Sequence, residues 1–183
     1  MRRYLHDLVR QSARDHHEAA ALTSGSATLT YGELWQHVQA VGAGLQRLGL
    51  SRGDRVGVFL DKRIETVTGI FGTSAAGGVF VPINPLLRSR QVHYILGDCD
   101  VRVLITSKER YELLREDLAK LPALKHVVLI NSPANLESNG AHQFHSWSDL
   151  TADGGAGPAD RGVIDIDMAA IFYTSEIGRA SCR

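Results

Sequence analysis

The clearest pattern of hydrophobic and polar positions lies in the stretch from Arg55 to Pro85. Val56 to Leu60 is a short apolar run between the polar turn of residues 51–54 and Asp61. An apolar run of this length between turn residues is typical of a strand that is buried on both faces of a parallel sheet. The stretch therefore begins with a predicted central strand.

A helix and a second strand follow in the same stretch. Asp61 is placed to cap the helix, and Gly77 with Gly78 is placed to end it. Val79 to Ile83 is again mostly apolar, and prolines limit this run. The helix positions expected to face inward have helical spacing, namely Ile64, Val67, Ile70, Phe71, Ser74 and Ala75. A strand, a crossover helix and a parallel strand predict one right-handed unit.

The same helix carries a second face of small residues, Gly69, Gly72 and Ala76. Each glycine in a helix interior costs roughly 1 kcal/mol relative to alanine, so this face needs a reason. We interpret it as a surface for close packing against a neighbouring element, in preference to a direct ligand contact.

The chain before this unit predicts a short amphipathic helix near residues 5–12, a hairpin and a long helix. Ala19 to Thr23 and Ala27 to Leu29 are the strands of the hairpin. Thr30 and Glu33 have the spacing of a capping box, and Gly49 is placed as the left-handed residue after the helix.

The chain after Pro85 continues the alternation of helices and strands. Its predicted elements are a helix over Ser89–Leu96, a strand over Val101–Ile105, a helix capped by Thr106 with Glu109, and a strand over His126–Ile130. This alternation predicts an α/β fold: an open, doubly wound, mostly parallel sheet with flanking helices, and a small N-terminal hairpin.

The domain organisation expected from these patterns has four parts. Residues 1–130 form an α/β subdomain. Residues 131–163 form a loop-rich excursion and connector, with one short element near Phe144 to Leu150. Residues 164–175 form a strand, Met168 to Tyr173, that leads to Thr174 and Ser175, and residues 176–183 form a tail.

Composition narrows the function classes. The chain has 183 residues, of which 44% are hydrophobic, and its 20 basic residues equal its 20 acidic ones. A net charge of zero gives no indication of a nucleic-acid partner, and no apolar run reaches the ~20 residues of a transmembrane segment. Two cysteines, Cys99 and Cys182, are too few for a disulfide framework, so a reducing, cytoplasmic location is expected.

Thr174 and Ser175 are the candidate site, because ligands bind at the carboxyl ends of strands in such sheets. The following residues 176–183 contain one glycine and no lysine, which does not suit a phosphate cradle. A hydrolase G-x-S-x-G elbow is excluded, because Tyr173 and Ile177 stand where it needs glycines.

The remaining candidate groups favour structural interpretations. His142 and His145 lie three apart in the loop-rich region with no third ligand in view, so no metal site is predicted. His16 and His17 are interpreted as solvated surface, and Cys99 as a small core residue.

Four stretches carry a resemblance to a known family. They are residues 29–34 (LTYGEL), 49–56 (GLSRGDRV), 75–85 (AAGGVFVPINP) and 167–175 (DMAAIFYTS). Their order and spacing resemble the N-terminal part of the AMP-forming, adenylate-forming enzymes, which include acyl-CoA synthetases, peptide-synthetase adenylation domains and luciferases. The resemblance covers about Thr30 to Ser175 and is nearest to an acyl-CoA ligase.

The resemblance implies roles for Thr174 and Ser175 as the first residues of the ATP phosphate loop. Glu176 stands where the family has glycine, and the rest of the loop pattern is missing. Residues 176–183 are therefore expected to be a vector-derived tail.

The resemblance also implies the reaction of the parent enzyme. A carboxylic acid and ATP, with Mg²⁺, would give an acyl-adenylate and pyrophosphate, and coenzyme A would then displace AMP. The 183-residue polypeptide alone is expected to bind no cofactor, to be inactive, and to self-associate through exposed internal surfaces.

Two other hypotheses remain open from the sequence. One is a stand-alone α/β binding or interaction module. The other is a different nucleotide-binding α/β domain, against which the missing G-x-G-x-x-G and GK[ST] patterns argue.

Overall fold

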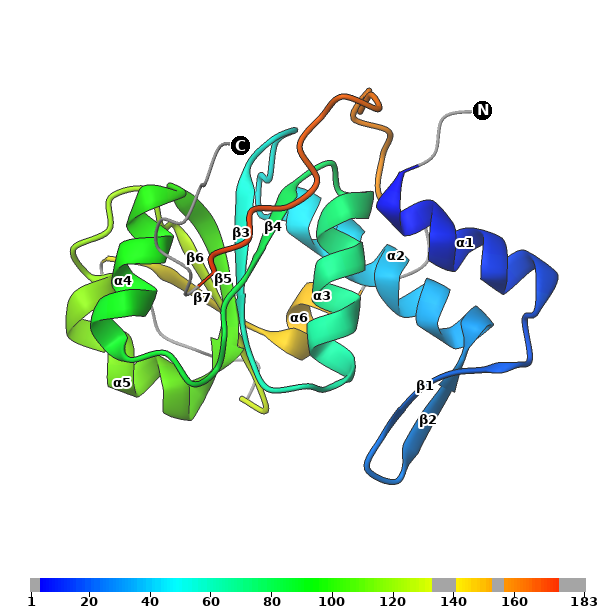
Figure 1. Cartoon of the computed structure of the whole chain (residues 1–183), viewed down its shortest axis with the longest axis horizontal. Coiled ribbons are helices and arrows are strands. Elements are labelled where there is room, and N and C mark those ends of the chain that lie inside the picture. The colour runs from blue at the N-terminus through cyan, green and yellow to red at the C-terminus, as the bar shows by residue number, and fades with distance from the viewer. Residues whose placement is uncertain (1–3, 133–140, 153–156, 175–183) are drawn as a thin grey trace, which may run out of the picture.

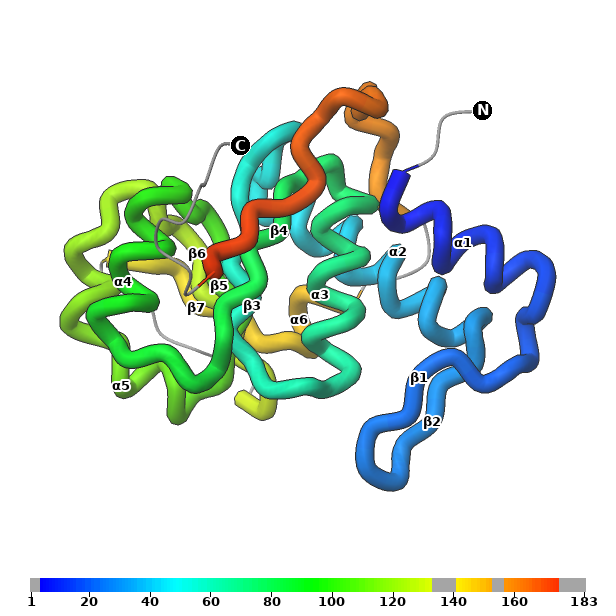
Figure 2. Tube along the Cα trace, viewed as in Figure 1, coloured from blue at the N-terminus to red at the C-terminus, as the bar shows by residue number. Residues whose placement is uncertain are grey.

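The computed structural model describes residues 4–132, 141–152 and 157–174. Figures 1 and 2 show a central sheet with helices on both faces and a hairpin that projects from one end. The elements are α1 (Leu5–Asp15), β1 (Ala20–Ser24), β2 (Ala27–Thr30), α2 (Tyr31–Arg47), β3 (Arg55–Phe59), α3 (Ile64–Ala75), β4 (Val79–Pro82), α4 (Ser89–Asp98), β5 (Val101–Ser107), α5 (Lys108–Leu118), β6 (His126–Ile130), β7 (Gln143–Ser146) and α6 (Trp147–Thr151).

The main sheet has five strands in the order β4-β3-β5-β6-β7, and every neighbouring pair is parallel. β1 and β2 form a separate antiparallel hairpin. The predicted fold class is confirmed. The strand order reverses between β3 and β5, so their carboxyl ends form the topological switch point of the sheet.

The two faces of the sheet bury different side chains of the same strand. On β6, Val127 and Leu129 join the core beneath α4 and α5, whereas Val128 and Ile130 join the core beneath α2 and α6. This alternation follows from the two-residue period of a strand. Because both faces are covered, the strands read as continuous apolar runs.

The long helix α2 begins and ends as predicted. Thr30 Oγ1 accepts a hydrogen bond from the Glu33 amide at 3.2 Å, and the Glu33 carboxylate accepts one from the Thr30 amide at 2.8 Å. Gly49 has a φ of +82°, and the Leu50 amide donates to the Leu45 carbonyl at 3.1 Å. None of the helices that the structure describes is long and apolar enough to cross a membrane.

The small face of α3 packs directly on α2. A Cβ atom added to Gly72 would lie 2.5 Å from Val41 Cγ1, and one added to Gly42 would lie 3.2 Å from the Gly72 carbonyl oxygen. The two backbones therefore approach more closely than larger side chains would allow. The close-packing interpretation is confirmed for Gly72.

Two predicted helix caps are wrong by one or two residues. The N-cap of α3 is Arg63, and the Asp61 carbonyl oxygen instead accepts a hydrogen bond from Thr66 Oγ1 at 2.6 Å. The N-cap of α5 is Ser107, because the Thr106 hydroxyl donates to the carbonyl oxygen of Phe59 in the core.

The short element predicted near Phe144 is a strand followed by a helix. β7 pairs in parallel with β6, with His126 opposite Gln143, and so extends the sheet. Ser146 caps α6 by accepting a hydrogen bond from the Asp149 amide at 3.0 Å. The loop-rich excursion therefore returns to the sheet that residues 55–130 build.

The strand expected over Met168–Tyr173 is reduced to a single parallel bridge between Ala170 and Phe80 of β4. Phe80 donates its amide to the Ala169 carbonyl, and the Ile171 amide donates to the Phe80 carbonyl, both at 3.1 Å. The next bond of the ladder would need an amide from Pro82, which has none. The ladder therefore stops after one residue.

The contact between α2 and α3 gives a stability prediction. Gly72→Ala should lower the free energy of unfolding by about 1–3 kcal/mol, because the new methyl group overpacks against Val41. Gly69→Ala is the matched control, since its added Cβ would lie 3.3 Å from the flexible end of Ile105 and at an ordinary contact distance of 3.8 Å from Val58 Cγ2. The control gains helix propensity of roughly 1 kcal/mol and should be neutral or stabilising.

Urea denaturation followed by circular dichroism measures both variants. Equal free energies of unfolding for Gly72→Ala and Gly69→Ala would contradict the close contact.

Candidate functional site

Thr174, one of the two predicted site residues, lies on a strap that crosses the outer edge of the sheet. We define the strap as residues 157–174, drawn in orange and red in Figure 1, where its last part runs beside β4. Thr174 is exposed and is the last residue that the structure describes. Ser175 and the tail of residues 176–183 lie outside the described residues. Of the two predicted site residues, the structure therefore describes Thr174.

The first part of the strap is fastened to α2 and α1. Gln46 forms a pair of hydrogen bonds with Ala159: its Nε2 donates to the Ala159 carbonyl at 2.9 Å, and its Oε1 accepts from the Ala159 amide at 2.8 Å. The Tyr4 hydroxyl donates to the Val163 carbonyl at 2.6 Å. These bonds fix the strap over the end of the α2–α3 pair.

An ion pair holds the middle of the strap. The Arg52 guanidinium donates two hydrogen bonds to the Asp167 carboxylate, both at 2.8 Å, and the Ile164 amide donates a third at 3.0 Å. Hydrogen bonding from Arg52 lowers the pKa of Asp167, so this carboxylate stays ionised at neutral pH. Arg52 lies in the turn before β3, so this ion pair joins the strap to the start of β3.

Tyr173 holds the end of the strap next to Thr174. Its hydroxyl donates to the Asp98 carboxylate and lies 3.3 Å from Cys99 Sγ, and its ring meets Tyr94 edge to face at 6.4 Å. Burial, together with the hydrogen bond to Asp98, raises the pKa of Tyr173, so the phenol stays protonated and remains a donor. Cys99 is buried at the end of α4, which agrees with its interpretation as a core residue.

The sequence motifs did not predict these anchors, although two of the motifs contain them. Arg52 lies in the 49–56 stretch and Asp167 in the 167–175 stretch, so two of the four resembling segments contact each other through a salt bridge. A pair of opposite charges 115 residues apart gives no local signal, and only the fold brings it together.

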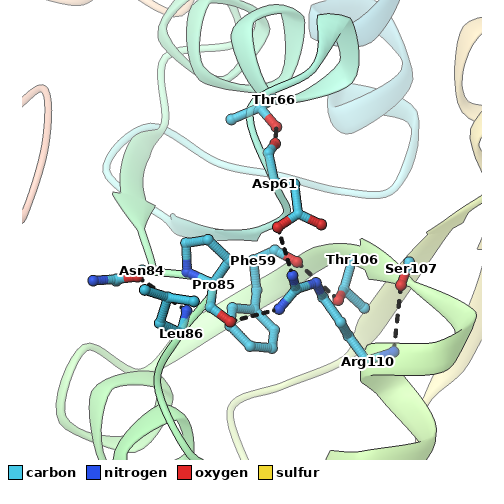
Figure 3. A network of polar contacts seen from close by, with 9 residues as sticks. All are labelled: Phe59, Asp61, Thr66, Asn84, Pro85, Leu86, Thr106, Ser107 and Arg110. Carbon is cyan, nitrogen blue, oxygen red and sulfur yellow. Dashed lines mark hydrogen bonds and ion pairs between the residues drawn. The ribbon is translucent and has the colours of Figure 1, made fainter.

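Arg110 of α5 lies at the switch point of the sheet, where its side chain binds other groups of the chain (Figure 3). The Arg110 guanidinium donates to the Pro85 carbonyl at 2.8 Å and to the Asp61 carboxylate at 2.7 Å, and it lies 4.8 Å from the centre of the Phe59 ring. It therefore links the segments that leave β3 and β4 to the start of α5. Its charge is neutralised by Asp61, so we do not assign it to a ligand.

The described residues do not form a complete anion site around Thr174. Arg52 is paired with Asp167, and the other cation near the end of α4, Arg55, donates to the backbone carbonyl oxygens of Cys99 and Asp100. Two hollows of about 730 and 680 Å³ lie along the strap, and neither includes Thr174 in its lining. Phosphate binding would therefore need groups beyond the described ones.

The histidines do not gather into a metal centre. His142 is buried, and its Nδ1 lies 3.0 Å from the Leu124 carbonyl oxygen, whereas His145 contacts His126 on the neighbouring strand. Over residues 4–132, 141–152 and 157–174, no three His, Cys, Asp or Glu side chains are placed to hold a metal ion. His16 and His17 are exposed just beyond α1, as predicted.

Comparisons with known proteins agree with this architecture. A family profile described as "AMP-binding enzyme" matches residues 9–175. Syringomycin synthase SyrB1 of Pseudomonas syringae pv. syringae is 30% identical over 102 residues, which are 56% of this chain and 17% of that protein. Surfactin synthase subunit 3 of Bacillus subtilis (strain 168) is 29% identical over 124 residues, or 68% of this chain and 9% of that protein.

Solved structures of the same kind superpose on most of the chain. The anthranilate CoA ligase AuaEII in complex with anthranoyl-AMP matches with a TM-score of 0.84 and 26% identity, over 96% of this chain. VinN in complex with 3-methylaspartate matches with a TM-score of 0.72 and 28% identity, also over 96% of this chain.

These proteins are all longer than the chain, which spans 33% of AuaEII and 46% of VinN. The match nevertheless extends from α1 to the end of the strap, and the phosphate-loop entrance predicted at Thr174 lies inside it. Because the profile covers residues 9–175 of 183, the chain belongs to the AMP-binding enzyme family, the adenylate-forming synthetases and ligases.

Proposed function

We propose that this chain is the N-terminal part of an AMP-forming acyl-CoA ligase. In that reaction a carboxylate attacks the α-phosphorus of ATP and releases pyrophosphate. The thiol of coenzyme A then attacks the acyl carbon of the adenylate and releases AMP. The observation that carries the proposal is the anchored strap, which delivers the Tyr-Thr pair of the family motif to the sheet edge at Tyr173 and Thr174.

The chain's own residues serve the reaction by positioning. Asp167 and Tyr173 hold both ends of the segment that enters the phosphate loop, and the bridge at Phe80 sets its distance from β4. Thr174, and with it Ser175, would present hydroxyl groups to the ATP phosphates. ATP and Mg²⁺ would supply the phosphoryl chemistry when bound, and the residues named here would position the segment that precedes the phosphate loop.

A second candidate differs in the thiol that accepts the acyl group. The relatives named above that share 29–30% identity are a syringomycin synthase and a surfactin synthase. The chain would then belong to an adenylation unit, and the acceptor would be a carrier-bound phosphopantetheine thiol. We favour free coenzyme A because the four resembling stretches are nearest to an acyl-CoA ligase, and because AuaEII, a CoA ligase, superposes on the chain with a TM-score of 0.84.

A cytoplasmic location of the protein is part of the proposal.

The reaction proposal is tested by ATP–pyrophosphate exchange with a panel of fatty and aromatic acids. The complete gene product should catalyse exchange, whereas the 183-residue polypeptide should remain at the blank. Thr174→Val in the complete gene product should lower exchange about 10- to 100-fold, because a hydrogen bond to a charged group is lost. Thr28→Val in the exposed hairpin is the control and should have no effect.

The acceptor is tested in the same preparation by adding coenzyme A. Formation of an acyl-CoA supports the ligase, and exchange without any acyl-CoA product would favour the adenylation unit. Exchange by the 183-residue polypeptide alone would overturn its proposed inactivity.

We also propose that the 183-residue polypeptide self-associates through the strap. Ile166, Met168 and Phe172 are 61–85% exposed, and Tyr94 of α4 is exposed beside them. Large apolar side chains grouped on one exposed edge of a sheet favour association. We call these four residues the strap patch.

Sedimentation velocity at about 100 μM should show a dimer or a larger species. The double variant Met168→Ser, Phe172→Ser should shift the polypeptide toward monomer. Leu113→Ser removes an equally exposed leucine from α5, outside the strap patch, and should leave the species unchanged. A monomeric wild-type polypeptide, or equal dissociation by Leu113→Ser, would contradict the proposal.

A further inference from the structure

Two histidines face each other across the outermost strand pair of the sheet. His126 of β6 and His145 of β7 bring Nδ1 and Nε2 to 3.1 Å, with ring centres 5.2 Å apart and the rings tilted by 47°. This separation is that of a hydrogen bond in which one ring donates and the other accepts through its lone pair. The bond exists only while at least one of the two rings is neutral.

The register of the strands explains why these side chains meet. His126 lies opposite Gln143, so His145 is two positions further along β7 and on the same face of the sheet. Both rings are half-buried. Two donors are fewer than the three or four protein ligands of a typical zinc site, so we interpret the pair through proton binding.

Groups from three other elements act on the pair, and two of these groups are charged. Arg102 of β5 acts on His126 and disfavours its protonation, although Arg102 itself lies 3.6 Å from Asp54. Asp149 of α6 acts on His145 and favours its protonation. Hydrogen bonding to the Leu48 backbone, at the end of α2, also favours a protonated His126.

Burial outweighs these opposing effects on both rings. Burial is the largest cause that lowers the pKa of His126 and of His145 below the ordinary value of 6.5, and the positive neighbours of His126 lower its pKa further. An exposed histidine binds protons more tightly than these rings do. An open state therefore gains protons first, and stability of the closed state is lost as pH falls through 6.5.

The pair holds a unit at the edge of the sheet. β7 pairs only with β6 among the strands that the structure describes, and α6 follows it directly. On the far side of this unit, Arg47 of α2 donates to the Leu150 carbonyl at 3.0 Å, and Gly44 leaves room for Leu150 to touch the α2 backbone. Because α6 follows β7 directly, loss of the contact between the two rings weakens the attachment of both β7 and α6 to the sheet.

We propose that His126 and His145 form a pH-sensitive contact that holds β7 and α6 on the sheet at neutral pH and releases them in mild acid. Protonation of both rings removes the acceptor lone pair and places two positive charges at hydrogen-bond distance. The β7–α6 unit opens first because it lies at the edge of the sheet, where β7 has a strand partner on one side, β6. This inference does not depend on the proposed function.

Hydrogen exchange of the 183-residue polypeptide at pH 7.5 and pH 5.0 tests the proposal, after correction for intrinsic exchange rates. Protection of residues 143–151 relative to β3 should fall at pH 5.0 by about tenfold for each unit by which a pKa is lowered. In His145→Gln, whose amide can keep a hydrogen bond but cannot be protonated, the contribution of His145 is removed, so this relative loss should be smaller than in wild type and should reflect His126 alone. His37→Gln, an exposed position on α2, should behave as wild type.

A second measurement needs no variant. Two-dimensional NMR of the imidazole rings should show His126 and His145 titrating below the ordinary histidine pKa value of 6.5. The proposal is overturned if the two rings titrate with a pKa at 6.5 or above, or if wild type and His145→Gln lose protection equally. Should His145→Gln fail to fold, His126→Asn takes its place, since the Asn amide replaces Nδ1.

Discussion

The close approach of α2 and α3 is the contact on which the rest of this structure depends. Without side chains at Gly42 and Gly72, the two helix backbones lie against each other beside the sheet. This closeness lets the Gln46 amide group reach both the Ala76 carbonyl at the end of α3 and the backbone of Ala159. The position of the strap therefore depends on helix packing as well as on its own ion pair.

The order of the elements could be predicted well from the sequence, because buried positions are apolar and recur with the period of the helix or strand that carries them. The core strands of residues 55–60, 101–105 and 126–130 are nearly all apolar, since both faces of the sheet are covered. The helix caps were harder to predict, because Thr106 and Ser107 are equally good capping residues. The choice between them was made by the core, where Phe59 offers Thr106 a carbonyl oxygen. β7 was predicted only as an element of unknown type, since its mixed residues show their role only in register with β6.

The candidate site was predictable only in part. The motif around Thr174 drew attention to this part of the strap, but it did not predict the contacts that hold the strap in place. Arg52 and Asp167 are unremarkable as single charges, and Tyr173 finds Asp98 only because α4 and the strap end at the same edge. Such pairs depend on the three-dimensional course of the chain, which no local pattern encodes.

Pro82 has a consequence beyond the shortened strand. Pro82 has no backbone amide to donate. The ladder of hydrogen bonds between β4 and the strap therefore cannot continue beyond Ala170, whichever residues follow it in the strap. The position at which the strap leaves the sheet is thereby fixed by β4. Insertions or deletions in the segment that follows could then change its length without changing the residue at which the strap leaves the sheet.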